Sequence, residues 1–481
     1  MSVREKTLPV EPAPAATQPA HDKEIGWLPD CVYTGDKFET GLAFFADATG
    51  RITRFTRESA DLSRAKRLPG QAALPGMVNT HAQSWQRVLR GRFELRLRSD
   101  RETLGDWTER LALALGRLTA DDLYDAARLA FLEMLATGIT CVGEAHTLQR
   151  AADGAPWPEP HLGARAILRA ARDVGVRICL LNGFSNRADF GQPAGSGPAR
   201  GLTPTAEQFL QESDSLRAHI EKNLPGDEAW LGVTVRGLGT APLEMMKTVA
   251  AYAHAKRLRL HVVLGASAHE AAACVAEYGR TPAVLLGEHG LLDKRFVAVH
   301  GVHLSAEDVR AIGAARVTVC ACPAAAAQLG EGSLAADQLL ATGATFALGT
   351  DGPLQSSVLD QARAIELLLR SQSARAVGLR GDLAAALWQM ATSAGARSLG
   401  APGGALEVGR PADFFTVNLF DPALVGAAPE QLLAAMVFGV SPRAVREVWV
   451  GARQRIGQWR HPAQSGIVAR FAELQQRLWS V

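Results

Sequence analysis

The sequence predicts an α/β protein, a closed (β/α)8 barrel with a small β-sandwich built from both ends of the chain. Eight short apolar runs rich in β-branched residues follow one another between residues 74 and 352. Longer Ala-, Leu- and Arg-rich stretches of helical period separate these runs. Both flanks of this region instead carry β runs broken by Gly and Pro. Eight strand–helix units over roughly 250 to 330 residues are what a closed barrel requires.

The eight runs are expected strands, because segments that are apolar on both faces fit parallel strands covered by helices. They occupy residues 74–81, 139–146, 176–184, 229–237, 258–265, 296–303, 317–323 and 345–352. After the first run, residues 121–138 place apolar side chains at helical spacing, with a start signal at 119–121 and Gly138 as the C-cap candidate. Residues 306–315 and 359–372 show the same helical period.

The flanks give the predicted domain boundaries. We expect a disordered Pro/Ala tail at 1–24, the two parts of the sandwich at 25–73 and 403–460, the barrel at 74–402 and a C-terminal helix at 461–481. Within 42–58 a polar turn separates two strand-like runs, which predicts a hairpin. The pairing of the two ends in one sandwich is inferred from their positions around the barrel.

Composition narrows the function classes. The chain has 481 residues, of which 47% are hydrophobic, enough for a large core. Its 51 basic and 49 acidic residues nearly balance, so we expect neither nucleic acid nor a membrane as a partner, and a small molecule instead. No apolar stretch approaches the ~18 residues of a membrane span, and no signal-peptide core is present, which predicts a cytoplasmic protein. The six scattered cysteines predict reduced, buried thiols.

Four segments carry a resemblance to a known family. They are LPGMVNTHAQSWQRVLRG at 74–91, VHGVHL at 299–304, LGTDG at 348–352 and LEVGRPADFFTVN at 406–418. Together they resemble the amidohydrolase superfamily and, within it, the formimidoylglutamate deiminases, which hydrolyse an imine-like C–N bond during histidine breakdown. The resemblance implies a TIM barrel of the amidohydrolase type, a homodimer, and zinc or another divalent metal as cofactor.

In such enzymes a bound metal lowers the pKa of a water toward ~7, and the ligands lie where barrel strands end. The family's first strand carries His-x-His. Here His81 remains, but Gln83 offers only an amide oxygen, a poor ligand for zinc. The fifth strand's His-x-Ala-Glu, which supplies a ligand and a proton-transfer group, matches Val-Leu-Gly-Ala at 263–266. The resemblance keeps His300 and Asp351 as catalytic residues, and leaves His81, Gln83 and Asp351 as a residual metal set that binds weakly or not at all.

The substrate-recognition positions are also altered. Gln86 is retained and Arg236 stands where the family has a histidine, so both are candidate substrate-binding residues. Thr108, Thr147 and Gly239 fall on the remaining recognition positions, where two arginines and a tyrosine are missing. 

Three other features keep two interpretations each. His261 shares a strand face with position 263 but would lie roughly 6 to 7 Å deeper, so we do not expect it to replace the lost ligand. Glu144 and His146 either reach the barrel mouth or form a structural pair. The Gly/Pro-rich loop at 185–201 is either a lid or a passive connection.

Three functional hypotheses follow. The leading one is an impaired deiminase relative without ordinary zinc-dependent activity, kept for binding or for pairing with an active relative. The alternative is an active hydrolase with altered or metal-free acid/base chemistry, in which His81, His300 and Asp351 act with Glu144 or His146. The third is ordinary deiminase activity that tolerates the ligand change.

Overall fold

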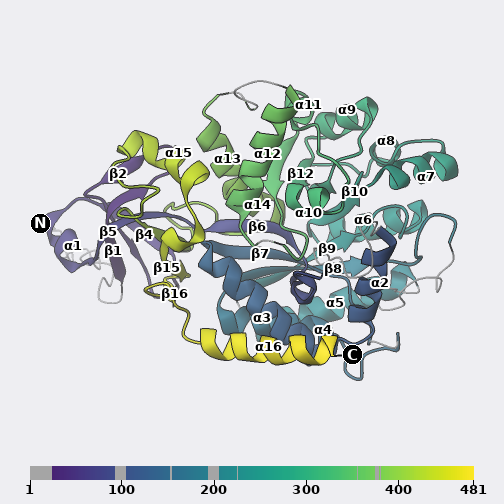
Figure 1. Ribbon diagram of the computed structural model, residues 1–481, viewed down its shortest axis with the longest axis horizontal. Coiled ribbons are helices and arrows are strands. Elements are labelled where there is room, and N and C mark those ends of the chain that lie inside the picture. Colours follow the sequence, from purple (N-terminus) through teal and green to yellow (C-terminus); the bar gives the residue numbers. More distant parts are fainter. Residues whose placement is uncertain are drawn as a thin grey trace, which may run out of the picture.

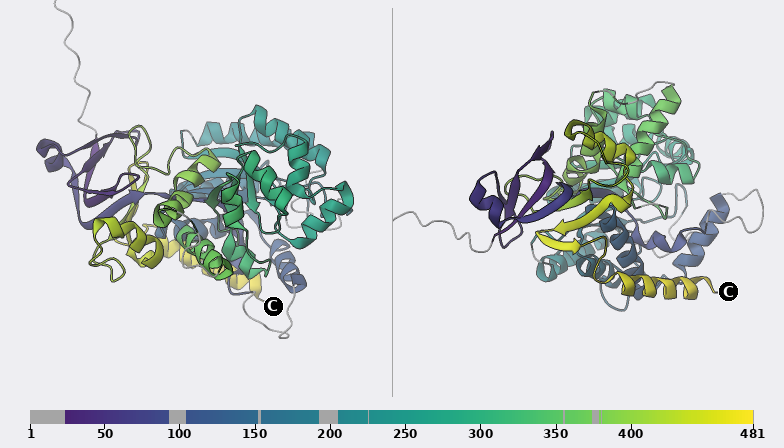
Figure 2. Two further views of the ribbon diagram at one scale, coloured as in Figure 1. Left: turned by 90° about the horizontal axis from the view of Figure 1, so that it is seen from above. Right: turned by 60° about the vertical axis from the view of Figure 1, so that its left-hand side comes forward.

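The structure is a computed structural model that describes residues 24–92, 104–151, 154–192, 205–224, 226–354, 356–373, 379 and 381–480. Within these ranges the strands form two eight-stranded sheets, one closed into a barrel and the other beside it (Figures 1 and 2). The predicted disordered tail lies outside the described residues, apart from Glu24. No described helix combines the length and apolar character needed to cross a membrane.

The barrel confirms the predicted fold class. Its strands run in chain order, each parallel to the next: β6 Met77–Ala82, β7 Ile139–His146, β8 Arg177–Phe184, β9 Ala229–Val235, β10 Leu260–Leu264, β11 Phe296–His300, β12 Thr318–Ala321 and β13 Thr345–Leu348. Beyond β13, the backbone N–H groups of Thr350 and Asp351 donate to the carbonyl of His81 at 3.0 and 3.1 Å. These bonds join the last strand to the first, and they hold Asp351 beside His81.

The first apolar run, residues 74–81, covers the end of one strand and the start of the next, although its sequence pattern shows no break. Leu74 and Pro75 end β5 (Lys66–Pro75) of the other sheet, and the barrel strand begins only at Met77. Gly76 makes the break, because a Cβ there would lie 2.0 Å from Thr140 Oγ1. The last six residues of β5 and all of β6 are buried, so the apolar pattern continues across the junction. The predicted start of the first barrel strand at 74 is therefore wrong by three residues.

Helices surround the barrel (Figure 1). They are α3 Ala120–Ala136, α4 Leu162–Val174, α5 Ala206–Asn223, α6 Leu243–Ala255, α7 Ala268–Tyr278, α8 Pro282–Glu288, α9 Ala306–Ala314, α10 Pro323–Gln328, α11 Ala336–Ala341, α12 Val358–Ser373, α13 Leu383–Ala391 and α14 Ser393–Leu399. Thr119 and Asp122 form a capping box at the start of α3, and Gly138, with φ of +89°, follows its end. The predicted helices at 121–138, 306–315 and 359–372 are confirmed.

The second sheet unites the two chain ends. Its strands are β1 Ile25–Tyr33, β2 Phe38–Thr40, β3 Ala43–Ala46, β4 Ile52–Thr56, β5, β14 Phe414–Asn418, β15 Val445–Val450 and β16 Arg453–Ile456. β5 pairs with β1 from the first end and β14 from the last. The rings of Phe44 and Phe414 lie 5.0 Å apart across three strand spacings, which would be about 14 Å in a flat sheet. The sandwich is thus one curled sheet, closed over Trp27 and Trp449.

The remaining elements pack on the outside. They are α1 Ser59–Arg64, the 3-10 helix η2 Ser84–Leu89, α2 Leu104–Leu115, α15 Pro429–Gly439, the 3-10 helix η4 Pro442–Ala444 and α16 Gln464–Trp479. The C-terminal helix α16 lies along α3, where Arg477 pairs with Asp122 (Figure 1). All six cysteines fall in the described part of the chain, buried and without disulfide bonds.

Candidate active site

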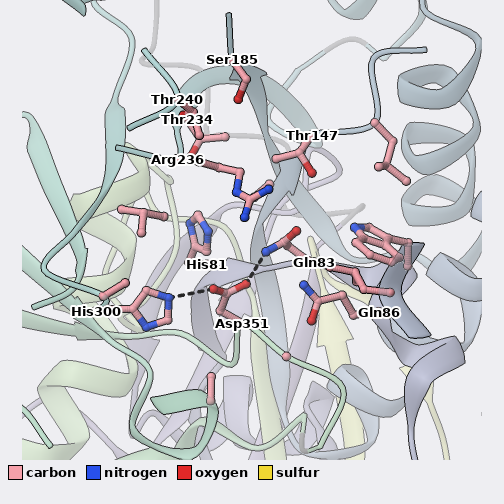
Figure 3. Close-up of a pocket in the computed structure, with 18 of the residues that line it drawn as sticks. His81, Gln83, Gln86, Thr147, Ser185, Thr234, Arg236, Thr240, His300 and Asp351 are labelled. Atoms are coloured by element: carbon pink, nitrogen blue, oxygen red, sulfur yellow. Dashed lines mark hydrogen bonds and ion pairs between the residues drawn. The ribbon is translucent and has the colours of Figure 1, made fainter. Parts of the chain in front are cut away.

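A cavity of about 320 Å³ opens at the carboxyl ends of the barrel strands (Figure 3). Each of the six predicted site residues lines it: His81, Gln83, Gln86, Arg236, His300 and Asp351. They come from segments far apart in the sequence and meet because parallel strands end on one face of the barrel. The volume lies within the range of small-molecule sites.

Asp351 is the centre of the polar floor. Gln83 donates its side-chain N–H to Asp351 Oδ1 at 2.7 Å, and His300 Nε2 lies 3.0 Å from Oδ2 (Figure 3). An ionised carboxylate only accepts hydrogen bonds, so the amide of Gln83 must present its nitrogen. Both oxygens of Asp351 are therefore occupied by N–H groups of the protein.

The contact between His300 and Asp351 is an ion pair. Burial lowers the pKa of His300, but the hydrogen bond and the negative charge of Asp351 outweigh it and raise that pKa to about 9. Burial opposes ionisation of Asp351, yet His300, His81 and Gln83 hold the pKa of its carboxyl well below the usual range. At neutral pH the pair is an imidazolium beside a carboxylate.

His81 continues the floor toward the barrel interior. Its ring stacks on that of His261, with centroids 5.7 Å apart and planes at 18°. Burial lowers the pKa of both rings, so both are neutral. His81 Nδ1 and the two ring nitrogens of His261 have no hydrogen-bond partner among the described residues. His261 does not line the cavity, which agrees with its expected deeper position.

The donor set does not fit a catalytic zinc ion. Such sites use three protein ligands and keep one open position. Here Gln83 turns an N–H toward Asp351, and Val263 places an apolar side chain on the cavity wall. In the described ranges, no group of three or more His, Cys, Asp or Glu side chains has an arrangement suited to a metal ion. His81, His300 and Asp351 offer good ligand atoms, but His300 carries a proton and donates to Asp351, whose other oxygen accepts from Gln83.

Arg236 is the free cation of the cavity. Its guanidinium points into the opening above His81, near the hydroxyl of Thr147 (Figure 3). Among the described residues it has no carboxylate partner and no hydrogen-bond acceptor. Ser185, Thr234 and Thr240 add further hydroxyls to the wall.

Of the other predicted recognition residues, only some line the cavity. Thr147 lines the cavity, whereas Gly239 does not, and the side chain of Thr108 lies outside the described residues. Sequence reasoning missed Arg187, which lines the cavity but is held by Glu277 at 2.9 Å. Its place just after β8 was the available signal, because the barrel mouth is built from such loops.

Glu144 supports the cavity from behind. Its Oε1 accepts the backbone N–H and the hydroxyl of Ser84 at 2.7 and 2.6 Å, which holds the start of η2 and so places Gln86. Burial raises the pKa of Glu144 to about 8. His146 lines a separate cavity with Trp157. Neither Glu144 nor His146 lines the candidate site, and the predicted structural pair is also wrong, because Oε1 of Glu144 bonds Ser84 and its Oε2 has no partner among the described residues.

Glu270 is a second buried carboxyl, which sequence reasoning missed. Its Oε2 accepts the backbone N–H of Ala266 at 2.9 Å, and its Oε1 has no partner in the described residues. Burial raises the pKa of Glu270 to about 7. It lies behind the cavity wall, which Ala266 lines. Glu270 stands three residues after Ser267, the N-cap of α7, so its position in the sequence is typical of an ordinary capping residue.

Comparison with known proteins places this geometry in context. The model of the amidohydrolase family matches residues 72–455. Formimidoylglutamate deiminase of Pseudomonas aeruginosa is 30% identical over 423 residues, which cover 87% of this chain and 92% of that protein. A crystal structure of an amidohydrolase from Brucella melitensis matches with a TM-score of 0.86 at 24% identity, covering 95% of this chain and 100% of the other. An adenosine deaminase from Xanthomonas campestris, solved with bound zinc, matches with a TM-score of 0.79 at 21% identity and covers 95% and 99%.

Proposed function

The chain belongs to the amidohydrolase family, and from that premise we propose that it binds a small anionic molecule at the barrel mouth without the ordinary zinc-dependent reaction. The family relatives are named as deiminases and deaminases, hydrolases of C–N bonds other than peptide bonds, so the scaffold is that of such a hydrolase. The hydrolysis of N-formimino-L-glutamate, the reaction of a formimidoylglutamate deiminase, is therefore the activity to test first.

The hydrogen bond between Gln83 and Asp351 carries the proposal. It places an N–H donor where the resemblance puts a metal-ligating imidazole, and it occupies the carboxylate oxygen that a metal would need. Val263 removes a third ligand position. Because His300 is protonated and bonded to Asp351, fewer than three side chains are left as ligands, and the activation of water by zinc loses its support.

The protonation states point in the same direction. A general base for water works best with a pKa near the working pH. Asp351 is too weak a base and His300, with a pKa of about 9, already carries its proton. Glu144 and Glu270 have pKa values nearer neutrality but do not line the cavity.

Arg236 supports the ligand class. An unpaired guanidinium over a neutral imidazole and a self-neutralised ion pair leaves one net positive charge in the opening. A carboxylate matches the planar fork of arginine and would bind it with two hydrogen bonds. Apolar Leu148 and Leu329 on the wall favour an organic anion.

A second candidate is metal-free hydrolysis, and Glu270 is the observation that favours it. Its carboxyl has a pKa of about 7 and binds the backbone of Ala266, the position of the family's proton-transfer glutamate. In this candidate Glu270 moves past Ala266 and takes a proton from water, whose oxygen bonds to the substrate carbon, while the C–N bond breaks and His300 donates its proton to the leaving nitrogen.

Metal content and turnover test the proposal together. The protein is loaded with zinc and dialysed, its metal is measured by elemental analysis, and N-formimino-L-glutamate hydrolysis is followed by ammonia release. We expect substoichiometric zinc and no turnover. The variant combining Gln83→His, Val263→His and Ala266→Glu should gain zinc, whereas the matched Gln83→Leu, Val263→Leu variant should not.

Each contrary result has a clear meaning. Stoichiometric zinc and rapid turnover in the unchanged protein overturn the proposal in favour of ordinary activity with a tolerated ligand change. Turnover without zinc that is lost in Glu270→Gln favours the second candidate. The homodimer implied by the resemblance stays a prediction, which sedimentation velocity tests.

A further inference from the structure

A second cavity, of about 340 Å³, lies at the opposite end of the barrel from the candidate active site. Its walls include Arg177 and Ala229, the first residues of β8 and β9, and thus the amino ends of barrel strands. Arg453 and Arg455 of β16 form the other side, together with Arg51 just before β4. The cavity therefore lies between the barrel and the curled sheet.

The lining of this arginine cavity is strongly basic. Of the described residues that form it, Arg51, Arg172, Arg177, Arg453 and Arg455 carry positive charge, and only Asp227 and Glu228 carry negative charge. Such a concentration is unexpected in a chain whose overall charge is only +2. A cavity lined by one sign of charge raises the local concentration of ligands of the opposite sign.

Most of these arginines have defined partners. The buried Arg177 clamps Asp413 with bonds of 2.6 and 3.1 Å and donates to the carbonyl of Asp227 at 2.8 Å. Arg51 pairs with the side chain of Asp227. These bonds hold two guanidinium groups in place at the cavity wall, and they use up the nearest carboxylates.

Arg455 is the exception. No carboxylate among the described residues lies within ion-pair distance of it, and its buried Nε has no hydrogen-bond acceptor. Burial lowers the pKa of Arg455, the positive charges of Arg453 and Arg177 lower it further, and the negative charges of Glu228 and Asp413 offset only part of this effect. A buried donor without an acceptor and a cation beside other cations are both unfavourable, and an anion would relieve both.

The position of Arg455 is also built into the fold. A Cβ on Gly175 would lie 2.5 Å from Arg455 Nε and 2.6 Å from its Cζ, so the glycine leaves room for the guanidinium. Gly175 ends α4 with φ of +86°, a conformation that already favours glycine. The guanidinium is thus packed in the gap between helix and sheet rather than extended into solvent.

We propose that the arginine cavity binds a small multivalent oxyanion, held chiefly by Arg455, while the other arginines of the lining add positive charge to the wall. A guanidinium group donates paired hydrogen bonds to phosphate and carboxylate oxygens, and the fork of Arg455 is open to such an anion, whereas that of Arg177 is already taken by Asp413. The volume accommodates a phosphorylated metabolite or a tricarboxylate rather than a single ion alone. Ligand and cavity together bridge the barrel and the curled sheet.

Isothermal titration calorimetry with pyrophosphate and with citrate tests the site, with sodium chloride at equal ionic strength as the blank. We expect saturable binding of at least one anion, weakened about tenfold or more in Arg455→Gln. Arg460→Gln removes an equal charge from an exposed position in the same segment and should bind as the unchanged protein does. Arg236→Gln, at the barrel mouth, should also leave this binding unchanged.

The two probes separate the sources of the anion. Pyrophosphate binding alone indicates a phosphorylated ligand, and citrate binding alone indicates a polycarboxylate. If Arg455→Gln does not fold by circular dichroism, Arg455→Lys keeps the charge, loses the fork and should still weaken binding. Absence of saturable binding, or equal binding by the unchanged protein and the Arg455 variant that folds, overturns the proposal.

Discussion

Gln83 and Asp351 are joined by a 2.7 Å hydrogen bond from amide nitrogen to carboxylate oxygen at the floor of the barrel mouth. Because His300 bonds the other oxygen, both carboxylate oxygens of Asp351 have a partner within the protein. A polar network that satisfies itself needs no ion to hold it together. The mouth of the barrel is therefore held in shape by hydrogen bonds among the protein's own side chains.

The ion pair of His300 and Asp351 predicts a pH dependence of stability. The raised pKa of His300 stabilises the folded state below about pH 6.5, its unfolded value, and this contribution is lost as pH rises toward 9. The lowered pKa of Asp351 stabilises the folded state above about pH 4, its unfolded value, and this contribution is lost as pH falls. We expect urea unfolding to show declining stability between pH 6.5 and 9.

Asp351→Asn tests the cause of that decline. The amide cannot hold the imidazolium, so the pKa of His300 should fall and the decline should flatten, with a loss of about 3 to 5 kcal/mol near pH 6 for breaking a buried pair. Titration of the His300 ring by NMR checks the shift directly. An unchanged His300 pKa in the variant would contradict the assignment.

Glu144 predicts a gain from removing a charge. Its pKa of about 8 means that folding disfavours the ionised form, so its contribution to stability falls as pH rises from about 4.5 through 8. Glu144→Gln keeps an oxygen to accept from Ser84 and never ionises, so we expect its melting temperature at pH 8.5 to equal or exceed that of the unchanged protein. Glu144→Ala loses both Ser84 bonds and should cost about 1 to 3 kcal/mol. Calorimetry that finds the Gln and Ala variants equally destabilised rules this out.

Arg236 predicts selectivity for anions at the mouth. Arg236→Gln should weaken the binding of a small dicarboxylate such as glutamate about tenfold or more and leave the melting temperature unchanged, because the side chain is exposed and unpaired in the described structure. Arg187→Gln is the matched control, since that arginine lines the same cavity but is already neutralised by Glu277. Calorimetric titration checks both. Equal loss of affinity in the two variants would show a general charge effect instead of a specific contact.

The sequence predicted the barrel because its strands are buried on both faces and read as uninterrupted apolar runs. The resemblance to the amidohydrolases named His81, His300 and Asp351 as site residues, and they meet in one cavity because parallel strands end on one side of the barrel. The donor direction of Gln83 was not readable, because either end of an amide can face a neighbour until the neighbour is known. Glu270 was also not predicted as a site residue, because its position is that of a helix cap. The arginine cavity could not be predicted, because its residues are far apart along the chain.

At the boundary of the two sheets, position 76 has no room for any side chain, so we expect it to accept only glycine. A Cβ there would lie 2.0 Å from Thr140 Oγ1 and 2.7 Å from Thr140 Cβ, so Gly76→Ala must push β7 away from the β5–β6 junction. We expect a loss of about 1 to 3 kcal/mol in urea unfolding, as for overpacking elsewhere. Thr140→Gly removes the obstructing atoms, so the double variant should be no less stable than Thr140→Gly alone. If Gly76→Ala costs the same with and without the Thr140 side chain, the contact is not what requires glycine at this position.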